Sequence, residues 1–334
     1  MSELRMDITS GDWIIVAPQR RERPNFLRVK RPVLEDNVAA CPFCPGNEAE
    51  TPLAVFQHPS QQKAWQIRVF PNKFPALSEQ PHGSTHGHVH PPELFTREKG
   101  FGFHEVIVET PEHDTHLALL SIDELLLLLE TFKNRYDQHR MHSRMQFIFL
   151  FRNQGPRAGA SMPHPHSQFL ALPIVPNPMV KRIEIAREFF QKKGRPLYGE
   201  ILCEEKRIGE RVVFETPEFL VFCPYASRTA YETWIFPKKQ DPYFWNISHL
   251  QIEDLAHVLK KFLGRLNQHL NNPDYNFVIY SAPFNCPGLG EIGSHDFSWH
   301  IKVFPRFATF AGFEIGSGIT INSLPPETAA QELR

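Results

Sequence analysis

Two stretches of the chain share one pattern of apolar and polar positions. Residues 120–139 (LSIDELLLLLETFKNRYDQH) and 250–269 (LQIEDLAHVLKKFLGRLNQH) carry apolar side chains three and four positions apart, the spacing of an amphipathic helix. Ser121 and Glu124 add a capping box at the start of the first stretch. Isoleucine, leucine, phenylalanine and arginine recur at equivalent positions of both. The pattern therefore predicts an internal duplication with one helix in each copy.

The segments around the two helices match in the same order. A β-type run that ends in a proline turn precedes each helix, and another β-type run follows it. A glycine-bearing loop and a strand containing histidine come next in both copies. The matching pairs are 104–114 with 231–241, 145–155 with 275–285, and 164–173 with 298–306. We therefore expect an α+β fold of two tandem repeats, each an antiparallel sheet packed against helices.

The repeats have a natural boundary between them. Residues 176–200 read as a helix followed by a turn at Gly194 to Pro196, which indicates a helical linker. We expect the first repeat to span residues 1–175 and the second to span residues 201–334.

Charge and composition narrow the class of protein. The 334 residues include 36 Lys and Arg against 37 Asp and Glu, so nothing favours nucleic acid or an anionic membrane as a partner. The richest apolar run, 117–132, is interrupted by three acidic residues and does not read as a membrane span. The first residues lack the features of a secretory signal, and an odd count of 5 cysteines argues against a disulfide framework. We expect a soluble, cytoplasmic protein.

Cys41 and Cys44 form a C-x-x-C pair in a turn rich in proline and glycine, which can present two thiolates to a tetrahedral ion. A redox dithiol and two incidental cysteines are the alternatives. His113 and His164 are candidates for the remaining ligands, although spacing alone cannot select them among 17 histidines. The loop 81–91 offers a competing cluster, which we interpret as a solvated connection. Its histidines are His82, His86, His88 and His90.

The duplication provides a test of the metal site. Each candidate ligand lacks a metal-binding counterpart in the second repeat. The cysteines align near Pro196 and Gly199, His113 aligns with Gln240, and His164 aligns with Ser298. Because the ligands are absent as a set, we expect one zinc ion per chain, in the first repeat.

The segment HPHSQ places His164, His166 and Gln168 at alternate positions. In a strand these side chains share one face, about 7 Å apart in successive pairs. They could be a pair of metal ligands, a nucleophile with its helper, or the hydrated face of an ordinary strand. The preceding segment, NQGPRAGAS, offers backbone amides and a hydroxyl group to a phosphate.

Four motifs carry a resemblance to a known family. RVFPNKFPAL, HEVIVETPEH, NQGPRAGASMPHPHSQ and AGFEIGSGITIN resemble the galactose-1-phosphate uridylyltransferase family, the transferase branch of the histidine-triad superfamily. The resemblance implies two histidine-triad-like repeats. It also implies transfer of a nucleoside monophosphate from a nucleoside diphosphate sugar to a sugar 1-phosphate through a nucleotidyl-histidine. UDP-glucose:hexose-1-phosphate uridylyltransferase is the activity it implies first.

The resemblance also implies the catalytic residues. His166 would be the nucleophile, and an imidazole with a pKa of about 6.5 is largely neutral at pH 7. Gln168 stands where the hydrolases of the superfamily carry a third histidine able to protonate a leaving group. Glutamine can only form hydrogen bonds with the phosphoryl oxygens, which suits a transferase whose sugar-phosphate leaving group needs no proton. Ser161 would lie beside the nucleophile.

Further roles follow from the same resemblance. A fully ligated structural zinc ion would be bound by Cys41, Cys44, His113 and His164. The nucleotide would contact Phe70 and Phe74 at the base, Asn72 at the ribose, and Asn153, Gly155, Gly159 and Ser161 at the phosphates. Arg20 and Arg23 would act across a subunit boundary, which implies a homodimer.

The sequence departs from the family at the acceptor end. Glu314 is kept, but Ala308 and Phe313 stand where the uridylyltransferases bind the hexose phosphate with lysine and tyrosine, and Lys73 replaces an acidic residue. This end resembles the ADP-glucose phosphorylases, so an ADP-sugar or dinucleoside polyphosphate phosphorylase is the alternative. A non-catalytic, zinc-containing scaffold that binds nucleotides is the alternative from another class. His300, the counterpart of His166, is expected to be structural or to face substrate.

Overall fold

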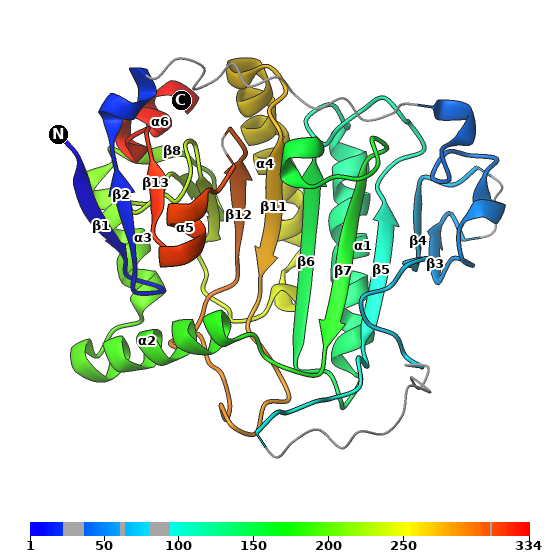
Figure 1. Ribbon diagram of the computed structural model, residues 1–334, viewed down its shortest axis with the longest axis horizontal. Helices are drawn as coiled ribbons and strands as arrows, with labels where there is room; N and C mark the ends of the chain where they lie inside the picture. The colour runs from blue at the N-terminus through cyan, green and yellow to red at the C-terminus, as the bar shows by residue number, and fades with distance from the viewer. Residues whose placement is uncertain (23–36, 61–63, 81–93, 308) are drawn as a thin grey trace.

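A continuous antiparallel sheet of 10 strands crosses the molecule (Figure 1). The computed structural model describes residues 1–22, 37–60, 64–80, 94–307 and 309–334. The histidine-rich loop with His82, His86, His88 and His90 lies outside these residues, as do Arg23 and Ala308. In spatial order the strands are β3 (Phe56–His58), β4 (Ile67–Pro71), β5 (Phe103–Val108), β7 (His166–Leu172), β6 (Phe147–Gln154), β11 (Tyr275–Tyr280), β12 (His300–Pro305), β10 (Thr233–Pro237), β9 (Phe219–Phe222) and β8 (Val212–Glu215).

The order of the strands repeats about the middle of the sheet. Strands β5, β7 and β6 on one side mirror β10, β12 and β11 on the other. The halves join where β6 pairs with β11, so that Asn153 lies opposite Asn276. The predicted α+β fold with antiparallel sheets is confirmed, and the two sheets merge edge to edge. Pairing β6 with β11 satisfies the backbone groups that two separate sheets would leave exposed at these edges.

Two long helices cover one face of the sheet side by side. They are α1 (Ile122–Arg140) and α4 (His249–Leu270), the two helices that the apolar spacing predicts. Each begins with a capping box, Ser121 with Glu124 and Ser248 with Gln251. Their apolar sides pack on the inward-facing residues of both sheet halves in one core cluster. The repeats therefore share a hydrophobic core on this face.

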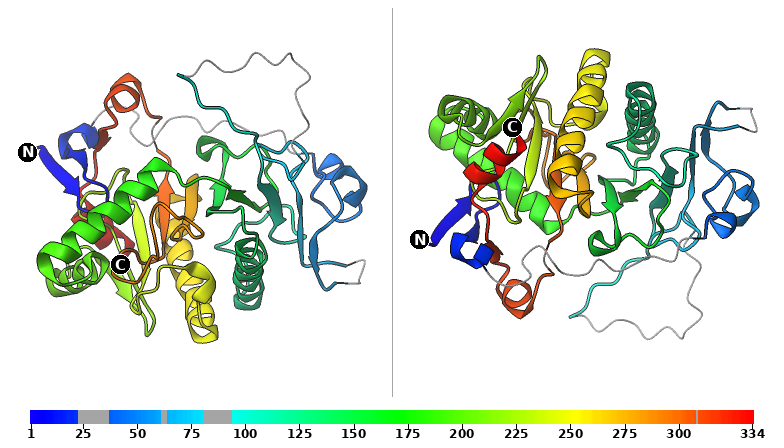
Figure 2. Two further views of the ribbon diagram at one scale, coloured as in Figure 1. Left: turned by 90° about the horizontal axis from the view of Figure 1, so that it is seen from below. Right: turned by 90° about the horizontal axis from the view of Figure 1, so that it is seen from above.

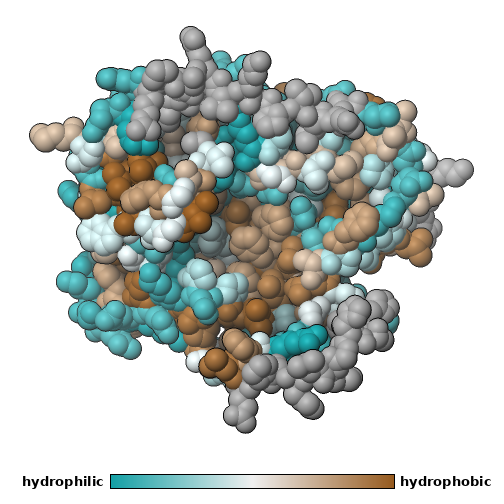
Figure 3. All heavy atoms as spheres, in the orientation of Figure 1, coloured by the Kyte–Doolittle hydropathy of each residue, from teal (hydrophilic) through white to brown (hydrophobic). Residues whose placement is uncertain are grey.

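The opposite face is only partly covered. Helices α2 (Asn177–Lys193) and α3 (Leu197–Ile208) follow β7 and pack mainly on the second half (Figure 2). Gly194 ends α2 with φ 68°, in the left-handed region that favours glycine. Over the middle of the sheet, the face shown in Figure 3 is hollowed and rich in apolar residues. The division into residues 1–175, 176–200 and 201–334 stays a prediction.

The first residues of the chain lie against its last ones. Strand β1 (Glu3–Asp7) pairs with β2 (Asp12–Val16), which pairs in parallel with β13 (Thr320–Asn322). The remaining α-helices of the described residues are α5 (Gly312–Ser317) and α6 (Pro326–Leu333). No helix among the described residues is both long enough and apolar enough to cross a membrane.

Candidate active site and metal centre

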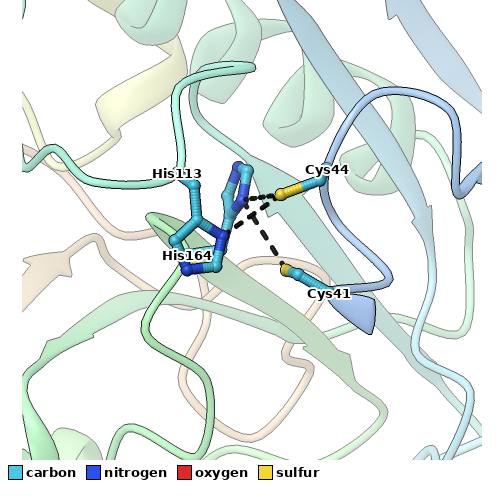
Figure 4. A group of neighbouring side chains, drawn as sticks. All are labelled: Cys41, Cys44, His113 and His164. Atoms are coloured by element: carbon cyan, nitrogen blue, oxygen red, sulfur yellow. Dashed lines mark hydrogen bonds between the residues drawn. The ribbon is translucent and has the colours of Figure 1, made fainter. Parts of the chain in front are cut away.

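Two cysteines and two histidines from three separate segments meet beside β7 (Figure 4). Cys41 and Cys44 lie in the turn after the short helix Val38–Ala40, His113 follows β5, and His164 precedes β7. All four side chains are buried, and their ligand atoms lie within 4.8 Å of one another. No other such group of His, Cys, Asp or Glu is found in the described part of the chain.

The geometry of this cluster fits a tetrahedral ion. The Nδ1 atom of His113 lies 3.1 Å from Cys44 Sγ, and His164 Nδ1 lies 3.5 Å from Cys44 Sγ and 3.8 Å from Cys41 Sγ. Zinc bound to two sulfur and two nitrogen atoms holds neighbouring ligand atoms about 3.5 Å apart. His164 Nε2 donates to the carbonyl oxygen of Thr110 at 2.9 Å, so the Nδ1 lone pair faces the sulfur atoms. The cluster can hold a metal ion.

Burial supports the same protonation state at His164. It lowers the pKa of His164 to about 4, with smaller effects from neighbouring groups. The ring is therefore neutral at pH 7, which is the form that a metal ligand requires.

His166 is the first residue of β7 and has different contacts. Its Nδ1 atom donates to the carbonyl oxygen of His164 at 2.9 Å, which leaves the lone pair on Nε2. The Phe43 ring packs against the imidazole, with 5.3 Å between ring centroids. Burial lowers the pKa of His166. The ring is held neutral, in the tautomer that presents Nε2 as a nucleophile.

The strand begins later than the segment 164–173 that the sequence indicates. Because β7 begins at His166, His164 does not share the strand face of His166 and Gln168. Pro165 precedes the strand, and its carbonyl oxygen accepts a hydrogen bond from Glu109 N–H at 3.2 Å. Proline has no N–H group for a sheet ladder, so the regular pairing starts only after it. His164 is therefore free of the strand geometry and turns toward the cysteines.

The loop between β6 and β7 carries the predicted phosphate contacts. Gly155 and Gly159 have φ values of 78° and 88°, which residues other than glycine rarely adopt. Ser161 is exposed in the same loop. Asn153 Oδ1 accepts a hydrogen bond from Asn276 Nδ2 at 2.8 Å, and Asn276 Nδ2 also donates to the Ala158 carbonyl oxygen at 2.8 Å. The second half of the sheet thus supports this loop.

A buried ion pair lies beneath the histidine strand. Glu109 accepts hydrogen bonds from Ser167 Oγ at 2.6 Å and from Arg152 Nε at 2.9 Å. Arg152 is only 2% exposed. Because Ser167 follows His166 directly, these contacts fix the backbone at the start of β7.

The structure separates the two phenylalanines predicted to flank a base. Phe74 is 83% exposed, whereas Phe70 is 2% exposed and packs against Phe43 with 5.7 Å between centroids. A side chain with no accessible surface cannot stack on a ligand, so Phe70 supports the site from beneath. Asn72 is half-buried, and its Oδ1 accepts from the Phe74 N–H at 2.8 Å.

Arg20 and Glu314 lie in separate elements from the histidine strand. Arg20 belongs to the short helix Pro18–Glu22. Glu314 lies in α5, where its side chain accepts from the Ala311 N–H at 3.1 Å. Neither side chain forms a hydrogen bond or ion pair with His166 among the described residues.

The second half keeps the backbone arrangement but not the chemistry. His300 Nδ1 donates to the Ser298 carbonyl oxygen at 2.8 Å, as His166 does to His164. The His300 ring is 1% exposed and stacks between Phe236 and Tyr280, at centroid distances of 4.2 and 5.3 Å. His300 therefore has the structural role of the two that we considered.

The region aligned with the metal cluster also differs in the second half. Gly199 lies so close to Gln240 that a Cβ atom at Gly199 would be only 2.5 Å from Gln240 Nε2. Gln240 and Ser298 align with His113 and His164 of the first half. Gly199 and Gln240 thus meet in space, and none of the aligned positions offers a thiolate or an imidazole.

His104 is the site residue that sequence reasoning missed. It lies on β5, and its Nε2 atom is 2.9 Å from Gln168 Oε1. Only the pairing of β5 with β7, in which Val106 lies opposite Gln168, reveals the contact.

Comparisons with known proteins agree with this geometry. Residues 1–176 match the model of the family described as galactose-1-phosphate uridyl transferase, N-terminal domain. The chain is 33% identical to ADP-glucose phosphorylase of Arabidopsis thaliana over 99% of its length and 92% of that protein. It is 29% identical to galactose-1-phosphate uridylyltransferase of Thermotoga maritima over 100% of its length and 98% of that protein. The crystal structure of the Arabidopsis thaliana phosphorylase with bound ADP-glucose superimposes with a TM-score of 0.83 at 31% identity, covering 100% of this chain and 99% of that one.

Proposed function

The chain belongs to the galactose-1-phosphate uridylyltransferase family and is a nucleotidyltransferase, and from this premise we propose that it works through a covalent intermediate on His166. The observation that carries the proposal is the His166 tautomer. Its Nδ1–H is bound to the His164 carbonyl oxygen, so Nε2 carries the lone pair. The loop with Gly155 and Gly159 lies immediately before this strand and can accept phosphate groups.

The proposed reaction has two steps. In the first, His166 Nε2 attacks the α-phosphorus of a nucleoside diphosphate hexose. A P–N bond forms, the bond between the α-phosphorus and the bridging oxygen breaks, and hexose 1-phosphate leaves with the electron pair. In the second, an oxygen of a phosphorylated acceptor attacks the same phosphorus, and the electron pair returns to Nε2. The proton stays on Nδ1 throughout, hydrogen-bonded to the His164 carbonyl oxygen.

We propose that the metal cluster binds one structural zinc ion. Two thiolates and two imidazoles complete a tetrahedral shell, which leaves no position for substrate. The ion would tie the cysteine turn to the segment that ends at His164. Since the His164 carbonyl oxygen holds His166, a rigid metal site would steady the nucleophile.

The acceptor in the second step is either a hexose 1-phosphate or inorganic phosphate. Uridylyl transfer from UDP-glucose to a hexose 1-phosphate is the activity that the histidine motif indicates first. Phosphorolysis of an ADP-sugar is supported by Phe313 and Ala308, which lack the polar groups expected for a hexose phosphate, and by the 33% identity to the plant phosphorylase.

We also propose that the protein is a homodimer that acts on nucleotide sugars and sugar phosphates. Partly exposed Phe149 and Phe151 of β6 and Leu170 of β7 alternate with the residues that pack against α1, so they lie on the incompletely covered face. The apolar surface of that face (Figure 3) suits a second copy of the chain. Arg20 would then reach the neighbouring subunit's site.

Covalent labelling tests the function. The protein is incubated with UDP-glucose or ADP-glucose labelled at the α-phosphorus, and acid-labile label on the protein is counted. We expect one of the two donors to label the wild type, His166→Ala to take up no label, and the control His249→Ala, changed on the surface of α4, to match the wild type. A chase with inorganic phosphate or galactose 1-phosphate then identifies the acceptor. Equal labelling of His166→Ala would refute the mechanism, and no turnover with either donor would favour the scaffold.

A further inference from the structure

A short chain of hydrogen bonds starts at a backbone amide and ends at Gln168. The Ala76 N–H group lies 3.1 Å from His104 Nδ1, and His104 Nε2 lies 2.9 Å from Gln168 Oε1. His104 and Gln168 are half-buried on adjacent strands, two residues out of direct register. Because this series of hydrogen bonds begins at a backbone N–H group, which can only donate, the direction of each hydrogen bond can be derived.

The tautomer of His104 follows from its first partner. A backbone N–H group can only donate, so His104 Nδ1 must accept and carries no proton. A neutral imidazole has one N–H group, which is therefore at Nε2. This group can only donate, so Gln168 must face it with the carbonyl oxygen of its amide.

Asn72 does not compete for this proton. Its Nδ2 atom lies 3.2 Å from His104 Nε2, but an amide nitrogen is not an acceptor. The Asn72 Oδ1 atom is already bound to the Phe74 N–H group at 2.8 Å, so the amide cannot turn round without losing that bond. Gln168 is the acceptor of the Nε2 proton.

We propose that His104 is a positioning residue that makes Gln168 present its amide NH₂ group, and not its carbonyl oxygen, to the transferred phosphoryl group. The inference rests on the proposed function of His166. Gln168 lies two residues after His166 on the same face of β7. The end of the amide that is turned away from His104 is therefore available to a phosphoryl group bound at His166. An NH₂ group donates to phosphoryl oxygens as negative charge develops there, whereas a carbonyl oxygen repels them.

Loss of His104 would remove this preference. Without a donor behind it, the Gln168 amide could rotate by half a turn and direct its oxygen at the phosphate. With His104 present, the rotated amide would lose the hydrogen bond from Nε2–H and would leave that group with the NH₂ groups of both Gln168 and Asn72 as neighbours and no acceptor. The effect therefore belongs to the chemical step and not to folding.

Two substitutions of His104 separate positioning from packing. In His104→Gln, the side-chain NH₂ group reaches about as far as Nε2 and can still donate to Gln168. His104→Phe keeps the ring but has no donor. We expect His104→Phe to slow single-turnover nucleotidylation by about ten- to a hundredfold at saturating donor, which is less than the loss of a whole oxyanion donor because the Gln168 amide is still present. His104→Gln should recover most of the rate, with all variants melting close to the wild type.

A double-mutant cycle with Gln168→Ala identifies the route. If His104 acts through Gln168, then His104→Phe in the Gln168→Ala background causes no further loss of rate. Additive losses, or equal rates for His104→Phe and His104→Gln, would overturn the proposal. If the effect passes through Asn72 instead, His104→Phe will copy Asn72→Ala and raise KM for the donor without slowing the chemical step.

A measurement that needs no activity keeps the inference separate from the proposed function. In protein labelled with ¹⁵N at histidine, long-range nitrogen–proton spectra distinguish the two tautomers. The signals of His104 are assigned by their loss in His104→Gln. We expect the Nε2–H form at neutral pH, and finding the Nδ1–H form would refute the proposal even if the donor for His166 is unknown. Failure of wild-type labelling would refute the proposed function alone.

Discussion

Two histidines that look equivalent in the sequence take different roles because of single contacts. His164 Nε2–H donates a hydrogen bond to the Thr110 carbonyl oxygen, so Nδ1 turns to the cysteines. His166 Nδ1–H donates to the His164 carbonyl oxygen. The choice of tautomer separates the proposed metal ligand from the proposed nucleophile. Pro165 allows the division, because the strand starts only after it.

The metal site leads to a prediction about Cys44. We expect wild-type protein to contain about one zinc ion per chain and Cys44→Ser to contain none, because Cys44 Sγ contacts both histidines of the cluster. The variant should melt several degrees lower, since metal binding contributes to folding. Metal analysis and thermal melting check this.

Cys203→Ser is the matched control for that experiment. Cys203 is an exposed cysteine on α3, outside the cluster, and its replacement should leave zinc content and melting unchanged. Two zinc ions per wild-type chain, or full zinc content in Cys44→Ser, would contradict the assignment of the ligands.

At the scale of elements, the pairing of β6 with β11 makes the second half part of the first half's site. Asn276 Nδ2 donates to the Ala158 carbonyl oxygen, which can only accept, so the end of Asn153 that faces Asn276 must be Oδ1. The NH₂ group of Asn153 then points to the loop, where it lies 3.8 Å from the position of a Cβ atom at Gly159. An element of one repeat thus orients a polar group of the other.

This contact predicts the effect of Asn276→Ala. The Asn153 amide would lose its fixed orientation, and we expect nucleotidylation to slow about tenfold, as for the weakening of one donor to phosphate. Asn153→Ala should slow it similarly, and the double variant should be no slower than either. Rapid-quench labelling checks this, with Gln268→Ala, an exposed amide on α4, as the control. An unchanged rate in Asn276→Ala would show that Asn153 needs no support.

At the scale of the whole molecule, the N-terminal strands are tied to the second half by buried charges. Asp7 Oδ2 lies 3.6 Å from Arg182 Nη1 of α2, and both side chains are 7% exposed. Burial alone would raise the pKa of Asp7, but the charges of Lys302 and Arg182 and hydrogen bonds from Thr9 outweigh it and lower the pKa to about 2. The folded state therefore favours ionised Asp7.

The direction of this pKa shift predicts a dependence of stability on pH. Because the folded pKa lies below the unfolded value, the contribution is fully present above about pH 4 and is lost as the pH falls toward about 2. It amounts to about 2 kcal/mol. Asp7→Asn should therefore unfold at lower urea than the wild type at pH 7, with a difference that shrinks as the pH falls from 4 toward 2.

Urea unfolding at several pH values measures this difference. Glu188→Gln, which removes an exposed carboxylate paired with Lys192, serves as the control and should leave the midpoint unchanged. Parallel pH profiles for Asp7→Asn and the wild type would show that Asp7 is not ionised preferentially in the folded state.

Much of the molecule could be predicted from spacing along the chain. The positions of the helices α1 and α4, the strands around them and the antiparallel α+β class follow from periodicity and duplication. The C-x-x-C pair followed from residue chemistry and the two histidines from the family resemblance, and the cluster brings these four together. The helices and strands depend on residues near one another in sequence and on a pattern that repeats, whereas the two histidine ligands needed the family motifs.

Other features were decided only by the tertiary structure. Four such features involve residues far apart in the chain. They are the burial of Phe70, the contact of His104 with Gln168, the support of Asn153 by Asn276 and the pairing of β2 with β13. The physical reason is strand register. A shift of one residue turns every side chain to the opposite face, and the register is selected by the burial of the whole sheet against its helices. Local pattern determined which residues could do the chemistry, and the register of the strands decided which of them face one another.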